Sequence, residues 1–151
     1  METVVHEVFG AVECDSASEL NVWESQGDLA GRRIELDMSF DGAVPPVAEL
    51  DALARYVTDL AVFDETARAA MRADLAEEES EVRDYLEHHD FTEEDAFLAE
   101  LRLSRVGLYA GQESGECQAV FDYTIDSQAT QYLVVVKFDD EAAVFEICME
   151  S

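Results

Sequence analysis

The C-terminal third of the chain carries the clearest pattern of apolar and polar positions. Four short runs rich in β-branched and aromatic residues lie between Arg105 and Met149, and turn signals separate them. The runs read RVGLYAG, CQAVFDYTID, QYLVVVKFD and AAVFEICM. The segment from Tyr132 to Val136 is apolar on both faces, which is typical of a strand buried on both sides. We therefore expect it to form the middle of a sheet.

The N-terminal part of the chain also predicts strands. Residues 3–14 are rich in β-forming side chains and predict a first strand. The segments LNVWES and RRIELDMSF predict a hairpin whose turn lies between Gln26 and Gly31. In its second arm, apolar and polar residues alternate: Ile34, Leu36, Met38 and Phe40 with Glu35, Asp37, Ser39 and Asp41. This arm should pair in the sheet, with one buried face and one solvent-exposed face.

Helical spacing dominates the middle of the chain. A proline pair opens a helix that the apolar spacing extends to about Leu60. Asp64 is expected to be the N-cap of a longer second helix, with a break near Glu78 to Ser80, where consecutive glutamates repel one another. Thr92 and Asp95 resemble a weak capping box, which predicts a last short helix.

These patterns together predict one α+β domain that spans residues 1–151. Strands come first, helices follow and strands end the chain, so the helices are expected on one face of a mainly antiparallel sheet. We expect about six to seven strands and two to three helices. A chain of 151 residues buries enough surface to hold a core without a disulfide or a metal.

The acidic balance is the strongest feature of the composition. The chain has 36 Asp and Glu residues against 9 Lys and Arg residues, a net charge of -27. Because 48% of the residues are hydrophobic, the chain is globular and the charge lies on its surface. Such a surface repels nucleic acids and anionic membranes and favours a basic protein as partner. The alternative is that the acidity only serves solubility, with counterions screening the repulsion.

Three further features predict a cytoplasmic protein. No apolar run reaches the ~20 residues that span a bilayer. The N-terminal segment METVVHEVFG lacks the basic part and apolar core of a signal peptide. Cys14, Cys117 and Cys148 lie far apart and form no C-x-x-C pair, which fits reduced thiols. The oligomeric state stays open at this point.

Sequence motifs for catalysis or metal binding are weak or missing. Residues 37–42 match the start of a calcium loop, D-x-S-x-D-G, but its twelfth position is Ala48 and the segment predicts a strand. His88 and His89 point ~100° apart on a helix, where an interaction with the helix dipole is the expected role. The hydrolase, nucleotide and dinucleotide motifs do not occur. We therefore expect no catalytic residue, no metal ligand and no cofactor.

Two acids lie in the best strand pattern of the chain. Asp122 and Asp126 fall on the face opposite Phe121 and Tyr123. An acid at such a position is either solvated or paired with an arginine. We expect Asp122 to form an ion pair with Arg105 of the preceding strand.

The C-terminal strands also carry a resemblance. The runs RVGLY (105–109), VFDYTID (120–126), YLVVVKFD (132–139) and the ending MES (149–151) together resemble an uncharacterised bacterial domain-of-unknown-function family of small acidic α+β proteins. The resemblance extends over most of the chain, including residues 85–89. It implies no assigned activity and no catalytic residues. It does imply cytoplasmic bacterial proteins of a kind found beside secreted toxins, which favours an immunity role.

Our first functional hypothesis is a small acidic inhibitor or immunity protein that docks a basic partner, such as a nuclease-type toxin. The expected partner-binding residues are Glu77, Glu78, Glu79, Glu81, Asp122 and Asp126. A DNA mimic is a subclass of this hypothesis. The alternatives are an enzyme or metal-dependent module that uses His88 or His89 with nearby carboxylates, and an acidic domain with no charge-based partner.

Overall fold

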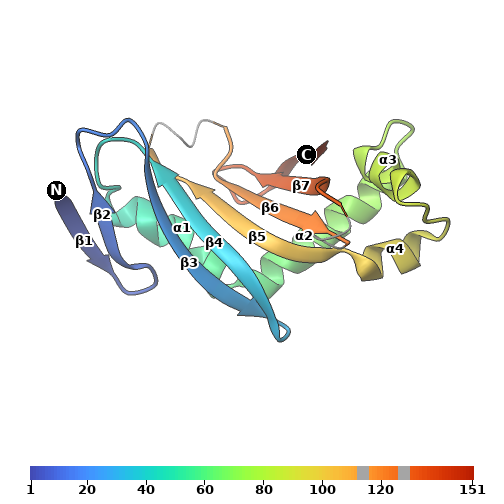
Figure 1. Ribbon diagram of the computed structural model, residues 1–151, viewed down its shortest axis with the longest axis horizontal. Helices are drawn as coiled ribbons and strands as arrows, with labels where there is room; N and C mark the ends of the chain where they lie inside the picture. Colours follow the sequence, from blue (N-terminus) through green and yellow to red (C-terminus); the bar gives the residue numbers. More distant parts are fainter. Residues whose placement is uncertain (112–115, 126–129) are drawn as a thin grey trace.

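A computed structural model describes residues 1–111, 116–125 and 130–151 of the chain. In these residues four strands are followed by four helices and four more strands (Figure 1). The strands are β1 (Glu2–His6), β2 (Gly10–Cys14), β3 (Asn21–Leu29), β4 (Arg32–Phe40), β5 (Arg102–Tyr109), β6 (Ala119–Thr124), β7 (Leu133–Phe138) and β8 (Val144–Glu150). The helices are α1 (Val47–Thr58), α2 (Leu60–Leu75), α3 (Glu81–His88) and α4 (Glu94–Glu100).

Six of the strands form one twisted sheet in the order β3-β4-β5-β6-β7-β8. Every neighbouring pair is antiparallel except β4 and β5, which are parallel. A parallel pair needs a long crossover, and here all four helices lie in the connection between β4 and β5. The helices α1 and α2 lie behind the sheet in Figure 1. The α+β class and the mainly antiparallel pairing predicted from the sequence are thus confirmed.

The helices and the sheet organisation differ from the sequence prediction. Four helices are present where two to three were expected, because the acidic break near Glu78 to Ser80 separates α2 from α3. The predicted strand at 3–14 is instead the hairpin β1–β2, which folds back at residues 7–9 and stays outside the main sheet. The expected single sheet is therefore a six-stranded sheet and a separate two-stranded one.

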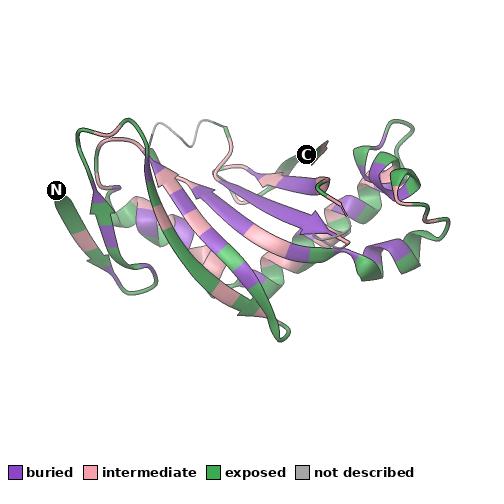
Figure 2. Ribbon diagram, in the orientation of Figure 1, coloured by how far each residue is buried: buried purple, intermediate pink, exposed green. Residues whose placement is uncertain are grey.

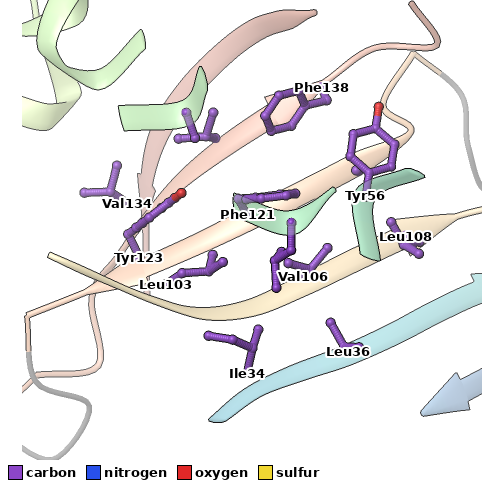
Figure 3. Close-up of a cluster of buried hydrophobic side chains, with 14 of the residues drawn as sticks. Ile34, Leu36, Tyr56, Leu103, Val106, Leu108, Phe121, Tyr123, Val134 and Phe138 are labelled. Carbon is purple, nitrogen blue, oxygen red and sulfur yellow. The ribbon is translucent and has the colours of Figure 1, made fainter. Parts of the chain in front are cut away.

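The apolar face of the sheet packs against α1 and α2 to form the core. Alternate residues of β4 to β7 point to this face, as Figure 3 shows for Ile34, Val106 and Phe121. The ring of Tyr56 of α1 packs at steep angles near Phe121 and Phe138, with ring centroids 6.3 and 5.6 Å away. All described residues of β6 are buried, whereas β7 lies next to the edge strand β8. The prediction of a strand buried on both sides is confirmed for Val134 to Val136 of the inner strand β7, but the middle of the sheet is formed by β5 and β6.

Several predicted element ends shift by a few residues. The β3–β4 turn is Ala30 and Gly31, both with positive φ (53° and 79°), so the hairpin is tighter than the predicted loop from Gln26. Two positive φ angles match the twist of the flanking strands. Helix α4 has Glu93 rather than Thr92 at its N-cap, without a side-chain cap. The break near Glu78 to Ser80 is confirmed.

The side chains of Trp23 and His6 help to hold the hairpin β1–β2 against the rest of the protein. Trp23 of β3 donates its Nε1 hydrogen to the carbonyl oxygen of Phe9 (2.9 Å) and packs edge-on against that ring. The buried His6 ring lies 2.7 Å from Asp51 of α1 through Nε2, while its Nδ1 accepts from the backbone N–H of Val8 (3.1 Å). Because Nδ1 accepts, the neutral ring carries its proton on Nε2 and donates it to Asp51.

Replacing His6 by alanine should lower the free energy of unfolding by about 1 to 2 kcal/mol, since the backbone N–H of Val8 and the Asp51 carboxylate both lose their partner. Urea unfolding followed by fluorescence of Trp23, the only tryptophan in the chain, measures this directly. Asp51→Asn is the control, because it keeps an acceptor oxygen and should cost less. Equal stability of His6→Ala and the wild type would show that the hairpin is not held by this contact.

Candidate functional site

The face of the sheet away from the helices carries a row of charged side chains. Strand alternation that points Val106 and Phe121 into the core points Arg105 and Asp122 to the other face. In the register of the sheet, Arg105 lies opposite Glu35 of β4 on one side and Asp122 of β6 on the other. We call this side of the sheet the open face. Figure 2 shows its central strands as mostly buried and β3 as mostly exposed.

Arg105 joins two carboxylates on this face. Its Nε and Nη2 atoms donate to the two oxygens of Asp37 (2.6 and 2.8 Å), and its Nη1 atom donates to Asp122 (3.0 Å). The side chains of Asp37 and Asp122 are only 17% and 8% exposed, and that of Arg105 is 34% exposed. The predicted ion pair between Arg105 and Asp122 is confirmed, and Asp37, expected on a strand face, is its second partner.

The electrostatics of this triad favour a structural role over acid–base chemistry. Hydrogen bonding to Asp37 raises the pKa of Arg105 further above its ordinary value, against the effect of burial. Burial raises the pKa of Asp122, and the hydrogen bond and charge of Arg105 oppose that shift. The guanidinium thus keeps its proton and donates to both oxygens of Asp37 and to one oxygen of Asp122. The triad therefore links β4, β5 and β6 across the open face.

Gly107 provides the space in which the guanidinium of Arg105 lies. A Cβ atom on Gly107 would stand 2.5 Å from Nη2 and 2.8 Å from Cζ of Arg105, and 3.0 Å from Cγ2 of Val120. The register of β5 with β6 shifts at a different place, between Leu103 and Arg105. There the hydroxyl of Ser104 donates to the carbonyl of Asp122 (3.1 Å). A side chain at position 107 would therefore displace the guanidinium of Arg105 from its place between Asp37 and Asp122.

The predicted acidic patch lies at the turn between α2 and α3. Glu77, Glu78 and Glu79 are exposed, and within the described residues none has a side-chain hydrogen bond or ion pair. The turn is shaped by Ser80, whose hydroxyl donates to Asp74 (2.6 Å) and accepts from the backbone N–H of the third residue beyond it (3.0 Å). We call Glu77, Glu78 and Glu79 the acidic turn.

The other three predicted partner-binding residues differ from the acidic turn. Glu81 accepts from the backbone N–H of Met149 in β8 (3.0 Å), so its carboxylate ties α3 to the sheet. Asp122 is 6% exposed and bonded to Arg105. Asp126 lies outside the described residues. The structure therefore brings Glu77, Glu78, Glu79 and Glu81 to one place and sets Asp122 apart on the open face.

A shallow hollow of about 320 Å³ adjoins the acidic turn, and sequence reasoning missed it. We call it the β8 hollow; it lies between α2 and the edge strand β8 and is lined by Ala70, Ala73, Asp74, Glu77, Val144, Phe145, Glu146 and Ile147. Phe145 is 40% exposed, because a register shift opposite residues 137 and 138 leaves it as the extra residue of a bulge. In the sequence, the exposed Phe145 is indicated only by its place in the apolar run AAVF of the last predicted strand.

The histidines are used for local packing. His89 donates from Nδ1 to the carbonyl oxygen of Tyr85 (2.8 Å), since that oxygen can only accept, and its Nε2 accepts from the hydroxyl of Thr130 (2.9 Å). The ring of His88 packs against Tyr132, with centroids 4.8 Å apart. Among the described residues no group of three or more His, Cys, Asp or Glu side chains could hold a metal ion.

The protein was also compared with known proteins and structures. No family model, no curated protein and no solved structure matches the chain. The resemblance to a bacterial family of small acidic proteins therefore stays a prediction. No helix in the described part of the chain is long and apolar enough to cross a membrane.

Proposed function

We propose that this chain is a binding protein that docks a basic protein partner through the acidic turn and the adjoining β8 hollow, as an inhibitor or immunity protein does. The observation that supports it most is a run of three exposed glutamates that have no side-chain hydrogen bond or ion pair within the described residues, the first of which, Glu77, lines the same hollow as the exposed ring of Phe145. Phe145 would be the apolar anchor of such an interface, and the glutamates its charged rim.

The charge of the chain supports the same proposal through association kinetics. A surface with a net charge of -27 attracts a basic partner over distances of about a Debye length, which raises the association rate. The carboxylates of the acidic turn would then meet lysine or arginine side chains at the rim, which selects against acidic or neutral partners. A cationic active site, such as that of a nuclease-type toxin, fits these requirements.

Three of the residues first expected to bind the partner are left out of the proposed surface, and one of them, Asp126, lies outside the described residues. Asp122 is buried, and a partner that bound it would have to displace Arg105. Glu81 already holds β8 through the backbone of Met149. The proposed surface therefore consists of Glu77, Glu78 and Glu79 with Phe145.

The test is a capture experiment with a matched pair of charge variants. The triple variant Glu77→Gln, Glu78→Gln and Glu79→Gln should lose a basic protein that the wild type retains from its native cell lysate at low salt and releases at high salt. With that partner purified, the dissociation constant should rise at least about tenfold in the triple variant. Phe145→Ala should weaken binding at every salt concentration, because its contact is apolar.

The control removes the same charge from the far end of the protein, where the β1–β2 hairpin lies (Figure 1). Glu2→Gln, Glu7→Gln and Glu13→Gln are exposed positions in or beside the hairpin strands, and this variant should keep the partner. If both triple variants lost the partner equally, binding would depend on total charge and the proposed surface would be wrong. Retention of the partner by both would also reject it.

A further inference from the structure

Most of the few basic residues in this acidic chain form ion pairs within it, but some do not. Six of the nine Lys and Arg residues form ion pairs with acids of the same chain: Arg33, Arg68, Arg72, Arg83, Arg105 and Lys137. Arg55 donates to the side chain of Gln118 and to a backbone carbonyl. Within the described ranges only Arg32 and Arg102 have no side-chain hydrogen bond or ion pair. Both are exposed, and both line the same hollow.

This hollow lies where the parallel strands β4 and β5 begin. It has a volume of about 520 Å³ and combines four arginines with two acids and an apolar wall. The lining residues are Arg32, Arg33, Glu35, Arg102, Leu103, Ser104, Arg105, Asp122, Thr124, Ile125 and Leu133. We call it the arginine hollow. Its lining is positive in a chain whose net charge is -27.

Three of the four arginines are available to a ligand. Arg105 already donates three hydrogen bonds to Asp37 and Asp122, so we do not count it among the groups available to a ligand. Arg33 has one long contact with Glu35 (3.8 Å), and both side chains are mostly exposed, so the pair is weak. Arg32 and Arg102 are the first residues of the neighbouring parallel strands β4 and β5, and both line the hollow at this end of the sheet.

We propose that the arginine hollow binds a small phosphate monoester with an apolar body. A guanidinium group can donate two parallel hydrogen bonds to a phosphate group. Three guanidinium groups offer more donors than the two oxygens of a single carboxylate can accept. A phosphate monoester offers three acceptor oxygens and a charge near -2 at neutral pH. The wall formed by Leu103, Ile125 and Leu133 takes the apolar body, and the volume is that of an ordinary small-molecule pocket.

The negative charge of the rest of the surface does not prevent this binding. Salt at physiological strength screens exposed charges beyond about 8 Å, so a ligand inside the hollow interacts mainly with the nearby arginines. The proposal is separate from the docking of a basic protein, because neither Glu77, Glu78, Glu79 nor Phe145 lines the arginine hollow. Each can fail without the other.

The test is a titration of the whole protein with phenyl phosphate at neutral pH and physiological salt, followed by backbone amide NMR shifts. Saturable shifts are expected at Leu103, Ile125 and Leu133. Arg32→Gln and Arg102→Gln should each weaken the affinity about tenfold. Both side chains are exposed, so these variants should keep the wild-type fold. Arg72→Gln removes one positive charge from an exposed position on α2 and should leave the affinity unchanged.

Two further probes test the apolar ring and the doubly charged group of the ligand one at a time. Benzoate has the apolar ring with one charge, and inorganic phosphate has the doubly charged group without the ring; each should bind more weakly than phenyl phosphate. The proposal is overturned if phenyl phosphate gives no saturable shift up to about 10 mM, which bounds the dissociation constant. It is also overturned if benzoate binds as tightly, or if Arg72→Gln lowers the affinity as much as Arg102→Gln does.

Discussion

Arg105→Ala is expected to lower the free energy of unfolding at neutral pH by about 3 kcal/mol. The substitution leaves Asp37 and Asp122, which are 17% and 8% exposed, as neighbouring like charges without a counterion. Removing one partner of a buried charge pair is costly because the other charge stays desolvated. Such a loss typically costs about 3 to 5 kcal/mol, and the partial exposure of Arg105 places the expected destabilisation at the lower end of this range. Urea unfolding at pH 7 measures it.

The destabilisation should shrink as the pH falls. Burial already raises the pKa of Asp122 in the wild type, and without Arg105 nothing nearby opposes that shift. A carboxyl whose folded-state pKa is raised binds its proton more tightly in the folded protein, so the folded state gains stability on acidification. The wild type and Arg105→Ala should therefore differ more at pH 7 than at pH 5. A difference that grew on acidification would contradict the triad as described.

Gly107 supplies the matched control for this prediction. Gly107→Ala places a methyl group against the guanidinium, which then has to leave Asp37 or Asp122. Its cost should be smaller once Arg105 is gone, since only the contact with Val120 remains. A double-mutant cycle of Arg105→Ala and Gly107→Ala should thus give a coupling energy of about 1 kcal/mol. Arg72→Ala, which breaks an exposed pair with Asp95, should cost less than about 0.5 kcal/mol.

Asp64→Ala is expected to lower the free energy of unfolding by about 2 to 3 kcal/mol. Asp64 lies one turn inside α2, is 14% exposed, and accepts from the hydroxyl of Tyr123 (2.6 Å) and from Nε of Arg68 (3.1 Å). Arg68 in turn donates to the carbonyls of Leu98 and Leu101 at the end of α4 (3.0 and 2.9 Å). One carboxylate thus organises contacts among α2, α4 and β6, and its loss leaves a buried phenol unpaired.

Substitution of Tyr123 tests whether its hydrogen bond to Asp64 contributes to this loss of stability. Burial, together with the charge of Asp64, raises the pKa of Tyr123, so the hydroxyl keeps its proton and donates. Tyr123→Phe should cost about 1 kcal/mol, and Asp64→Ala should cost less in that background than in the wild type. Additive effects of the two substitutions would mean that the hydrogen bond contributes nothing. Glu65→Ala, at the exposed neighbouring position, should change stability by less than about 0.5 kcal/mol.

The case of Asp64 shows where local sequence patterns mislead. An aspartate before an apolar helical run predicts an N-cap, which is the role expected for Asp64 from the sequence. The helix begins earlier, at Leu60, with Asp59 at its N-cap, and no side-chain hydrogen bond caps it. Asp64 points to Tyr123, which is 59 residues away in the sequence. No pattern within α2 indicates that partner.

The acidic turn follows from a local sequence pattern, whereas the exposed ring of Phe145 and the arginine hollow do not. The exposure of the acidic turn follows from a break in helical pattern, which consecutive glutamates indicate by themselves. The exposed ring of Phe145 depends on a register shift between β7 and β8, and the arginine hollow depends on the parallel pairing of β4 with β5. Register and pairing are set by packing between distant segments, so no local pattern encodes them.

The amino-acid sequence by itself determined the α+β class, the strands of the C-terminal third and the ion pair of Arg105 with Asp122. Alternation with a period of two and helical spacing are local properties, and an acid beside an arginine on adjacent hairpin strands needs only one pairing step. The tertiary structure decided that residues 2–14 form a separate hairpin, that Asp37 is the second partner of Arg105, and that Arg32 and Arg102 share one hollow. Those outcomes depend on which strands become neighbours, because burial of the whole apolar face selects one arrangement among many with the same local patterns.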